Sequence, residues 1–178
     1  MSKMVAMRER LKGRFNKGEA LTIYNNVRAG GGDIVEFCLQ FMYDDDVQVV
    51  RKALWALSKA GNKEIMRLQP LYDRFVDLAM STDNSSVRRL SLVLIERLEL
   101  REEGVRTDFL DFCLEHMADV KEAPAVQALC MKLAFRTCAL FPELRGEMVR
   151  TVEAMEMEYY TSAVRSVRER ILGVEKRV

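Results

Sequence analysis

The sequence predicts an all-α fold, an αα-superhelix (α-solenoid) of about four helix-pair repeats preceded by an N-terminal helical pair. A valine followed by a long polar residue returns at Val50, Val87, Val126 and Val164, at intervals of 37, 39 and 38 residues. The stretch EFCLQFMYD at 36–44 also aligns with DFCLEHMAD at 111–119, two intervals further on. A period in this range is typical of stacked supersecondary units. Apolar runs lie inside 3.6-residue patterns, which favour helices over strands.

Composition narrows the class of protein. A length of 178 residues with 49% hydrophobic residues is typical of one compact domain with a sizeable core. No run of 18 apolar residues predicts a membrane-spanning helix, and the basic N-terminus lacks the apolar stretch of a secretory signal. A net charge of +1 gives no overall attraction to nucleic acid or membranes. Four cysteines without a CxxC pair indicate buried thiols in a cytoplasmic protein, with no zinc or disulfide framework.

The first elements are a basic helix at 3–14 and a second helix at 17–28, which end at three consecutive glycines, 30–32. This N-terminal segment, 1–32, matches the repeat poorly, and an atypical first unit is what the end of a solenoid needs. Asp33 opens the first repeat, 33–61, as the N-cap of a helix at 34–43. The acidic turn Asp44-Asp45-Asp46 then leads into a helix at 47–60.

Three more repeats follow with the same helix-turn-helix plan. They are expected at 69–99, with helices 70–80 and 86–99; at 107–140, with helices 108–118 and 124–140; and at 142–172, with helices 143–156 and 161–172. Pro70 and Pro124 are compatible with first helical turns, where no backbone N–H is needed. A charged tail at 173–178 completes the chain.

The Asp- or Asn-containing turns followed by Val-Arg resemble those of the HEAT and armadillo-like helical repeat family, over residues 33–172. The resemblance implies the architecture and no particular activity. It also implies an ion pair between a turn residue such as Asp45 and Arg51, as part of a ladder along the stack. Thr82 and Arg88 keep half of this pattern, and Gln127 in place of an arginine predicts an interruption of the ladder in the third repeat.

In such a stack the second (B) helix of each repeat usually lines the concave surface, where long partners bind. Placing each residue at 100° per position turns several B-helix side chains away from the core. The candidate partner-binding residues are Lys52, Trp55, Lys59, Arg89, Leu92, Met131 and Phe135. Trp55 is the expected central anchor, because Trp is enriched among hot-spot residues. In the alternative interpretation, the apolar members of this row pack between neighbouring repeats.

Charge predicts the type of partner. The B segments 47–59, 86–97, 124–136 and 161–172 together carry +9, whereas the first (A) segments 33–46, 69–83, 107–119 and 143–158 carry −14. The basic B helices favour an acidic protein or peptide. In a second interpretation, the acidic and basic helices neutralise one another across solvated edges.

No pattern predicts an enzyme. His116 aligns with Phe41 on an apolar helix face, and the three glycines at 30–32 lack the Lys and Ser/Thr of a phosphate-binding loop. We therefore expect no catalytic residue, metal or cofactor, and a protein- or peptide-binding scaffold. The alternative is nucleic-acid binding, including similarity to HEAT-like DNA alkylation-repair proteins. That similarity rests on Trp55 and the basic B helices, with no carboxylate assigned. The sequence indicates neither the partner's identity nor an oligomeric state.

Overall fold

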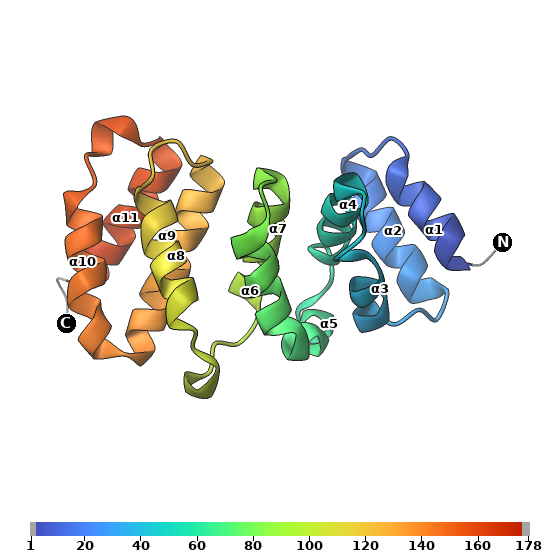
Figure 1. Cartoon of the computed structure of the whole chain (residues 1–178), viewed down its shortest axis with the longest axis horizontal. Coiled ribbons are helices and arrows are strands. Elements are labelled where there is room, and N and C mark those ends of the chain that lie inside the picture. The colour runs from blue at the N-terminus through green and yellow to red at the C-terminus, as the bar shows by residue number, and fades with distance from the viewer. Residues whose placement is uncertain (1–2, 176–178) are drawn as a thin grey trace. The chain divides into compact units, whose positions relative to one another are not determined.

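Residues 3–175 are described by a computed structural model, in which they form helices without a strand, so the predicted all-α fold is confirmed. The chain divides into two compact units, Met1–Glu99 (unit 1) and Leu100–Val178 (unit 2) (Figure 1). The prediction that the whole chain is one repeat domain stays a prediction.

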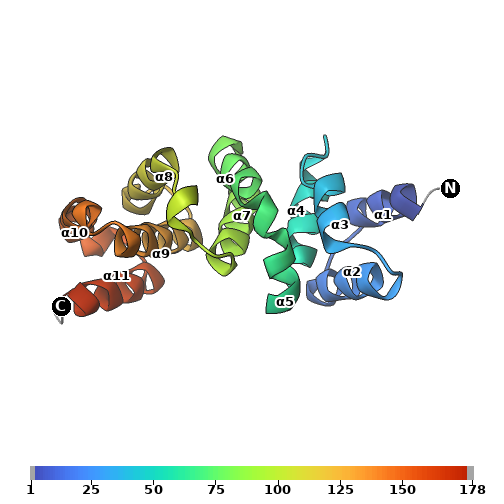
Figure 2. The same cartoon turned by 90° about the horizontal axis from the view of Figure 1, so that it is seen from below.

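Unit 1 is organised around helix α4. Its helices are α1 (Lys3–Lys12), α2 (Lys17–Ala29), α3 (Ile34–Phe41), α4 (Val47–Leu57), α5 (Asn62–Ile65), α6 (Tyr72–Ser81) and α7 (Ser85–Arg97), with a 3-10 helix at Met66–Leu71. Helix α4 packs against α1, α2, α3 and α7, and α6 pairs with α7 (Figures 1 and 2). Apolar side chains of α4 are therefore covered on more than one side of the helix.

Side-chain caps explain where four of these helices begin. Asn16 forms a capping box with Glu19 at the start of α2. Asp33 accepts hydrogen bonds from the backbone N–H groups of the first turn of α3, as Asp46 does for α4 and Asn84 for α7. An Asp or Asn oxygen at this position satisfies N–H groups that have no partner inside the helix. The predicted capping role of Asp33 is thus confirmed.

The glycines after α2 are required by the geometry of the turn. Gly31 has a φ of +68°, which is strained for residues with a side chain. A Cβ atom on Gly32 would lie 2.8 Å from the carbonyl oxygen of Val27. The chain can therefore turn back on α2 only with glycine at these positions.

Helix α4 ends at Leu57, earlier than the predicted residue 60, and a short helix, α5, follows. The guanidinium of Arg97, from α7, donates hydrogen bonds to the carbonyls of Ser58 and Ala60, at 2.9 and 2.6 Å. These carbonyls need no N–H donor from a longer α4, because the Arg97 side chain, 37–39 residues away, supplies the hydrogen bonds. The predicted start at Pro70 is also wrong, since Pro70 lies inside the 3-10 helix and α6 begins at Tyr72.

An ion pair ties α1 to the first repeat. The Arg8 guanidinium donates to both carboxylate oxygens of Asp44, at 2.6 and 2.7 Å. These hydrogen bonds are the main cause of a lowered pKa of Asp44. Because this pKa lies below its ordinary value, the pair stabilises the fold at neutral pH, and the contribution is lost as the pH falls through the lowered pKa.

Unit 2 is organised around α9. Its helices are α8 (Thr107–Ala118), α9 (Pro124–Leu140), α10 (Arg145–Ala154) and α11 (Ser162–Glu175), with 3-10 helices at Glu102–Gly104, Pro142–Leu144 and Met157–Tyr159. Helix α9 packs against α8, α10 and α11 (Figure 2). Of the expected tail 173–178, α11 includes residues up to Glu175, and 176–178 lie outside the described residues.

The long side chain after each repeated valine has a defined task in three repeats. Arg88 donates to the carbonyls of Ala79 and Thr82 at the end of α6. Gln127 donates to the Asp119 carbonyl at 2.6 Å, and Arg165 to the Tyr160 carbonyl at 3.0 Å. Gln127 therefore donates to a main-chain carbonyl just before its helix, as Arg88 and Arg165 do in their repeats. The third repeat thus has this contact, although the sequence predicted an interruption there.

The first repeat departs from this pattern. The Arg51 Nε atom donates to Gln48 in its own helix, at 3.1 Å. Within residues 3–175, no ion pair joins Asp45 to Arg51, because the Asp44 carboxylate is the one held by an arginine, Arg8. The ion pair that the family resemblance implied is thus wrong for this repeat.

The repeated valines themselves are core residues. Val50, Val87, Val126 and Val164 expose 5%, 1%, 0% and 0% of their surface. Burial of all four valines, at intervals of 37 to 39 residues, agrees with the predicted register, and the bounds of the repeats stay a prediction.

Val87→Asp should unfold the chain or lower its free energy of unfolding by at least ~4 kcal/mol, because it buries an unpaired carboxylate. Val47→Asp is the matched control, since Val47 is 41% exposed at the first position of α4, where a negative charge is favourable. Thermal melting followed by circular dichroism measures both. Similar melting temperatures for the two variants would show that the register is wrong.

Candidate partner-binding surfaces

Lys52, expected at the rim of the B-helix surface, is buried, with 6% of its surface exposed. Its ammonium group donates to the carbonyls of Lys12 and Gly13, just after α1, at 3.2 and 2.5 Å. It also lies 5.5 Å from the centre of the Phe15 ring, in cation–π geometry. The expectation that Lys52 is an exposed rim residue is wrong, because its ammonium group is hydrogen-bonded to carbonyls at the end of α1 and is not available to a partner.

Trp55, the expected anchor, is half-buried. Its ring lies 5.3 Å from that of Phe15, at an interplanar angle of 48°. The segment between α1 and α2 therefore covers part of the indole. Part of the ring remains accessible to solvent.

Leu92 and Met131 expose none of their surface, so the expectation that they continue an open contact surface is wrong. Leu92 is on α7, which packs against both α6 and α4, and Met131 is on α9, which has three helical neighbours. A helix wheel that assumes one buried stripe assigns such positions to solvent. For these two residues, packing within the unit is the correct interpretation.

The other three candidates keep accessible surface. Lys59 is exposed in the turn after α4, and Arg89 is half-buried on α7. Phe135, on α9, lines a hollow of about 190 Å³ with Val167 and Ile171 of α11, flanked by Lys132 and Arg170. We call this set of five residues the Phe135 hollow.

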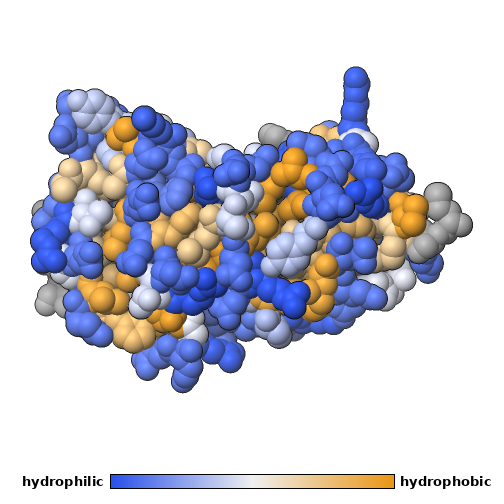
Figure 3. Space-filling view, viewed as in Figure 1, coloured by the Kyte–Doolittle hydropathy of each residue, from blue (hydrophilic) through white to orange (hydrophobic). Residues whose placement is uncertain are grey.

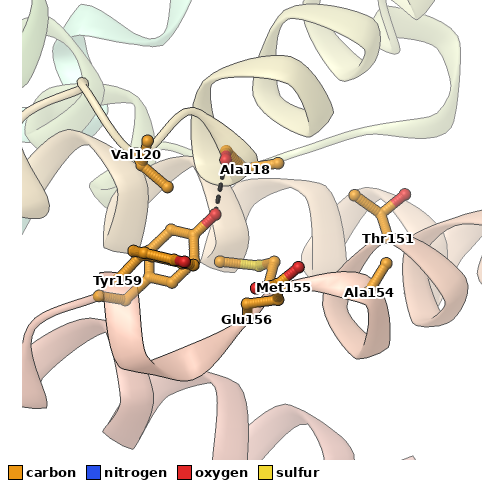
Figure 4. Close-up of a pocket in the computed structure, with 8 residues that line it drawn as sticks. Ala118, Val120, Thr151, Ala154, Met155, Glu156 and Tyr159 are labelled. Carbon is orange, nitrogen blue, oxygen red and sulfur yellow. Dashed lines mark hydrogen bonds between the residues drawn. The ribbon is translucent and has the colours of Figure 1, made fainter.

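A larger hollow lies at the end of unit 2 where the two intra-repeat connections meet, and we call it the turn-edge groove. Its volume is about 420 Å³, and it is lined by Ala118, Val120, Thr151, Ala154, Met155, Glu156, Tyr159 and Tyr160 (Figure 4). Val120 and Tyr159 are 53% and 63% exposed. Across the face of unit 2 drawn in Figure 3, apolar patches lie among hydrophilic side chains.

Partly buried hydrogen bonds join the segments that line and flank this groove. The Tyr160 hydroxyl donates to the Ala118 carbonyl at 2.6 Å, which joins the α10–α11 connection to the end of α8 (Figure 4). Glu122 accepts from the Ala123 N–H at 2.8 Å and lies 2.7 Å from the His116 ring nitrogen. His116, expected on an apolar helix face, lies in the last turn of α8, and its contact with Glu122 connects it to the α8–α9 turn. Its ring centre is 4.0 Å from that of Phe112, at an interplanar angle of 36°.

Unit 1 has a comparable hollow of about 270 Å³ between its own intra-repeat turns, lined in part by Tyr43, Asp45 and Val47. Tyr43 and Val47 are 54% and 41% exposed. Sequence reasoning missed both hollows, although the alignment of 36–44 with 111–119 contained a signal. That alignment places Tyr43-Asp44, in the turn after α3, over Ala118-Asp119, where α8 ends.

Residues 3–175 contain neither an exposed cysteine nucleophile nor a cluster of metal ligands. The four cysteines are buried and form no disulfide, and burial raises the pKa of the Cys38 thiol to about 12. Burial and a hydrogen bond with Cys130 also raise the pKa of Cys113. Within the same residues, no three His, Cys, Asp or Glu side chains are placed to hold a metal ion. None of the described helices is both long and apolar enough to cross a bilayer.

A family model for the HEAT repeat domain matches residues 7–174, almost the whole chain. The chain belongs to the HEAT repeat family. This match agrees with the helix pairs and the buried valine register described above. Comparisons with curated proteins and with solved structures find no match.

HEAT repeats commonly serve as protein-interaction scaffolds, and the family is generally not enzymatic. In this HEAT repeat chain, the places with side chains accessible for such contacts include the following two. One is the B-helix surface, represented by Trp55, Lys59, Arg89 and the Phe135 hollow. The other is the edge formed by the intra-repeat turns.

Lys52→Met should lower the free energy of unfolding by about 1–3 kcal/mol, because the carbonyls of Lys12 and Gly13 lose a charged donor. Lys59→Met, the same change at an exposed position, should stay within about 0.5 kcal/mol of the wild type. Urea unfolding followed by circular dichroism gives both values. Equal effects would show that the Lys52 contacts contribute nothing to stability.

The thiols should not react with Ellman's reagent in the native HEAT repeat chain at pH 8, because all four are buried, and the raised pKa values of Cys38 and Cys113 suppress the thiolate at these two positions. In 6 M guanidinium chloride, about four thiols per chain should react, matching the four cysteines in the sequence. The absorbance of the released thiolate measures both. A fast-reacting thiol in the native chain would contradict the assignment of all four to the core.

Proposed function

We propose that the chain is a non-enzymatic scaffold that binds an acidic segment of another protein on its B-helix surface. The observation that carries this proposal is the Phe135 hollow. Phe135, Val167 and Ile171 form an apolar floor, and Lys132 and Arg170 flank it with positive charge. A volume of about 190 Å³ is below the range of about 300–1,000 Å³ typical of small-molecule sites. The hollow therefore fits a side chain of a peptide better than a free metabolite.

In unit 1, the proposal retains Trp55, Lys59 and Arg89 as partner-binding residues. A half-buried Trp held by Phe15 has little rotamer freedom left to lose on binding. Lys59 and Arg89 would attract an acidic segment and speed its association. The proposal also assigns the chain to the cytoplasm, where thiols such as these four stay reduced.

A displayed library of random peptides, selected on the purified chain, should return sequences in which Asp and Glu surround one large apolar residue. The affinity of the best peptide, labelled with a fluorophore, should fall about tenfold or more in Phe135→Ala, because the apolar contact is removed. It should also fall in Lys132→Glu/Arg170→Glu, with slower association and a weaker dependence on salt.

The matched control is Arg10→Glu/Arg14→Glu, which reverses two exposed charges in unit 1 and should leave the affinity unchanged. Thermal melting of each variant confirms that the fold is intact. Equal binding to all variants, or selected peptides without acidic residues, would refute the proposal. Binding of a labelled DNA that weakens steeply with salt would favour the nucleic-acid alternative instead.

A further inference from the structure

The turn-edge groove of unit 2 has its own apolar surface, made by different elements from the Phe135 hollow. Val120 comes from the α8–α9 turn, and Met155 and Tyr159 come from the connection between α10 and α11 (Figure 4). Tyr159, at 63%, is the most exposed large hydrophobic residue among the side chains that the structure describes, and Val120, at 53%, lies at the same groove. Large apolar side chains that gather at one hollow mark an interaction site more often than scattered ones.

The charge around the groove is acidic and is not neutralised by ion pairs. Glu156 lines the groove, Asp119 precedes Val120, and Glu153 and Glu158 are exposed neighbours of the lining residues. Elsewhere, Asp44, Asp33 and Asp108 each pair with an arginine. Within residues 3–175, no ion pair involves any of the four groove carboxylates. The same segments carry two exposed cations, Lys121 and Arg150, so the acidic residues are in excess.

Two of these carboxylates, Asp119 and Glu156, act on a residue at the floor of the groove, Tyr160. Burial is the main cause of the raised pKa of Tyr160, and the negative charges of Asp119 and Glu156 add to it. Two carboxylates from the two different connections therefore act on one buried hydroxyl. A cation entering the groove would meet both of them.

The groove is already formed before any partner binds. The Tyr160–Ala118 hydrogen bond joins its two walls at 2.6 Å. Gln127 holds the Asp119 carbonyl at 2.6 Å, and His116 holds Glu122 at 2.7 Å, which together fix the α8–α9 turn. A preformed site avoids much of the ordering cost of association.

We propose that the turn-edge groove binds an extended segment of a partner protein in which Lys or Arg stands next to one large apolar residue. The apolar side chain of the partner contacts Val120, Met155 and Tyr159. Its cations lie against Asp119 and Glu156, with Glu153 and Glu158 adding to the attraction. The volume of about 420 Å³ accommodates an apolar side chain together with part of the peptide backbone. This site prefers the opposite charge from the Phe135 hollow and does not depend on it.

The test uses an array of synthetic peptides, each with one Leu, Phe or Trp flanked by Lys and Arg, and a matched array flanked by Glu. The chain should bind peptides of the basic array through this groove. Acidic counterparts should not compete with a bound basic peptide for the groove. With the best basic peptide in solution, Tyr159→Ser should raise Kd about tenfold or more, and Glu156→Lys should raise it further at low salt. Both positions are exposed, so the fold should tolerate the changes.

Phe135→Ala is the matched control and should leave binding of the basic peptide unchanged, just as Tyr159→Ser should leave binding of the acidic peptide unchanged. The two sites thus fail or succeed separately. Equal affinity of the wild type, Tyr159→Ser and Glu156→Lys for the basic peptide, or no binding to the basic array, would overturn the proposal. Light scattering that shows self-association lost in Tyr159→Ser would also overturn it, because the occupant would then be a second copy of the chain.

Discussion

Carbonyl groups at helix ends need hydrogen-bond donors, and this requirement determines how the helix pairs of each unit are joined. The last turn of a helix leaves carbonyls without helical partners, and burying them unsatisfied is costly. Long side chains from neighbouring helices supply the donors here. Arg88, Gln127 and Arg165 do so within their repeats. Lys52 and Arg97 do so for the preceding helices, α1 and α4.

This use of side chains changes the meaning of the charge pattern. Much of the positive charge on the B helices is directed at backbone carbonyls, as Lys52, Arg88, Arg97 and Arg168 show. The carboxylates of the A helices and turns cannot serve carbonyls, because they only accept hydrogen bonds. Some of them cap helices, as Asp33 and Asp46 do. Others, such as Asp44 and Asp108, pair with an arginine. Glu156 and its acidic neighbours at the turn-edge groove form no ion pair within residues 3–175.

The periodic part of the architecture was predictable from the sequence. The valine interval reports the core because equivalent positions in stacked helix pairs have equivalent surroundings, and all four valines are buried. The capping roles of Asp33 and Asp46 depend on neighbours two or three positions away, so local sequence contains them. The hydrogen bonds of Lys52 join residues 39 and 40 positions apart, and no local pattern shows them.

The candidate surface was harder to predict, for two physical reasons. A helix wheel counts one buried face, whereas α7 and α9 each pack against more than one helix, so Leu92 and Met131 were misplaced. Tyr159 lies in a 3-10 segment outside the helical period, so the 100° rule has no bearing on its exposure.

These same reasons separate stability from recognition along the chain. Changing Leu92 or Met131 would leave a cavity in a packed core, which typically costs about 2–5 kcal/mol for truncation to alanine. Val120 and Tyr159 keep more than half of their surface in solvent, so replacing them removes little buried area. Turn-edge residues can therefore vary with the partner while the helices keep their packing.

Because the hydrogen bonds of Gln127 and Tyr160 use main-chain acceptors, the acceptor itself is preserved whatever side chain stands at those acceptor positions. The position of the groove is thus set by the backbone, and its chemistry by exposed side chains on which the fold does not depend.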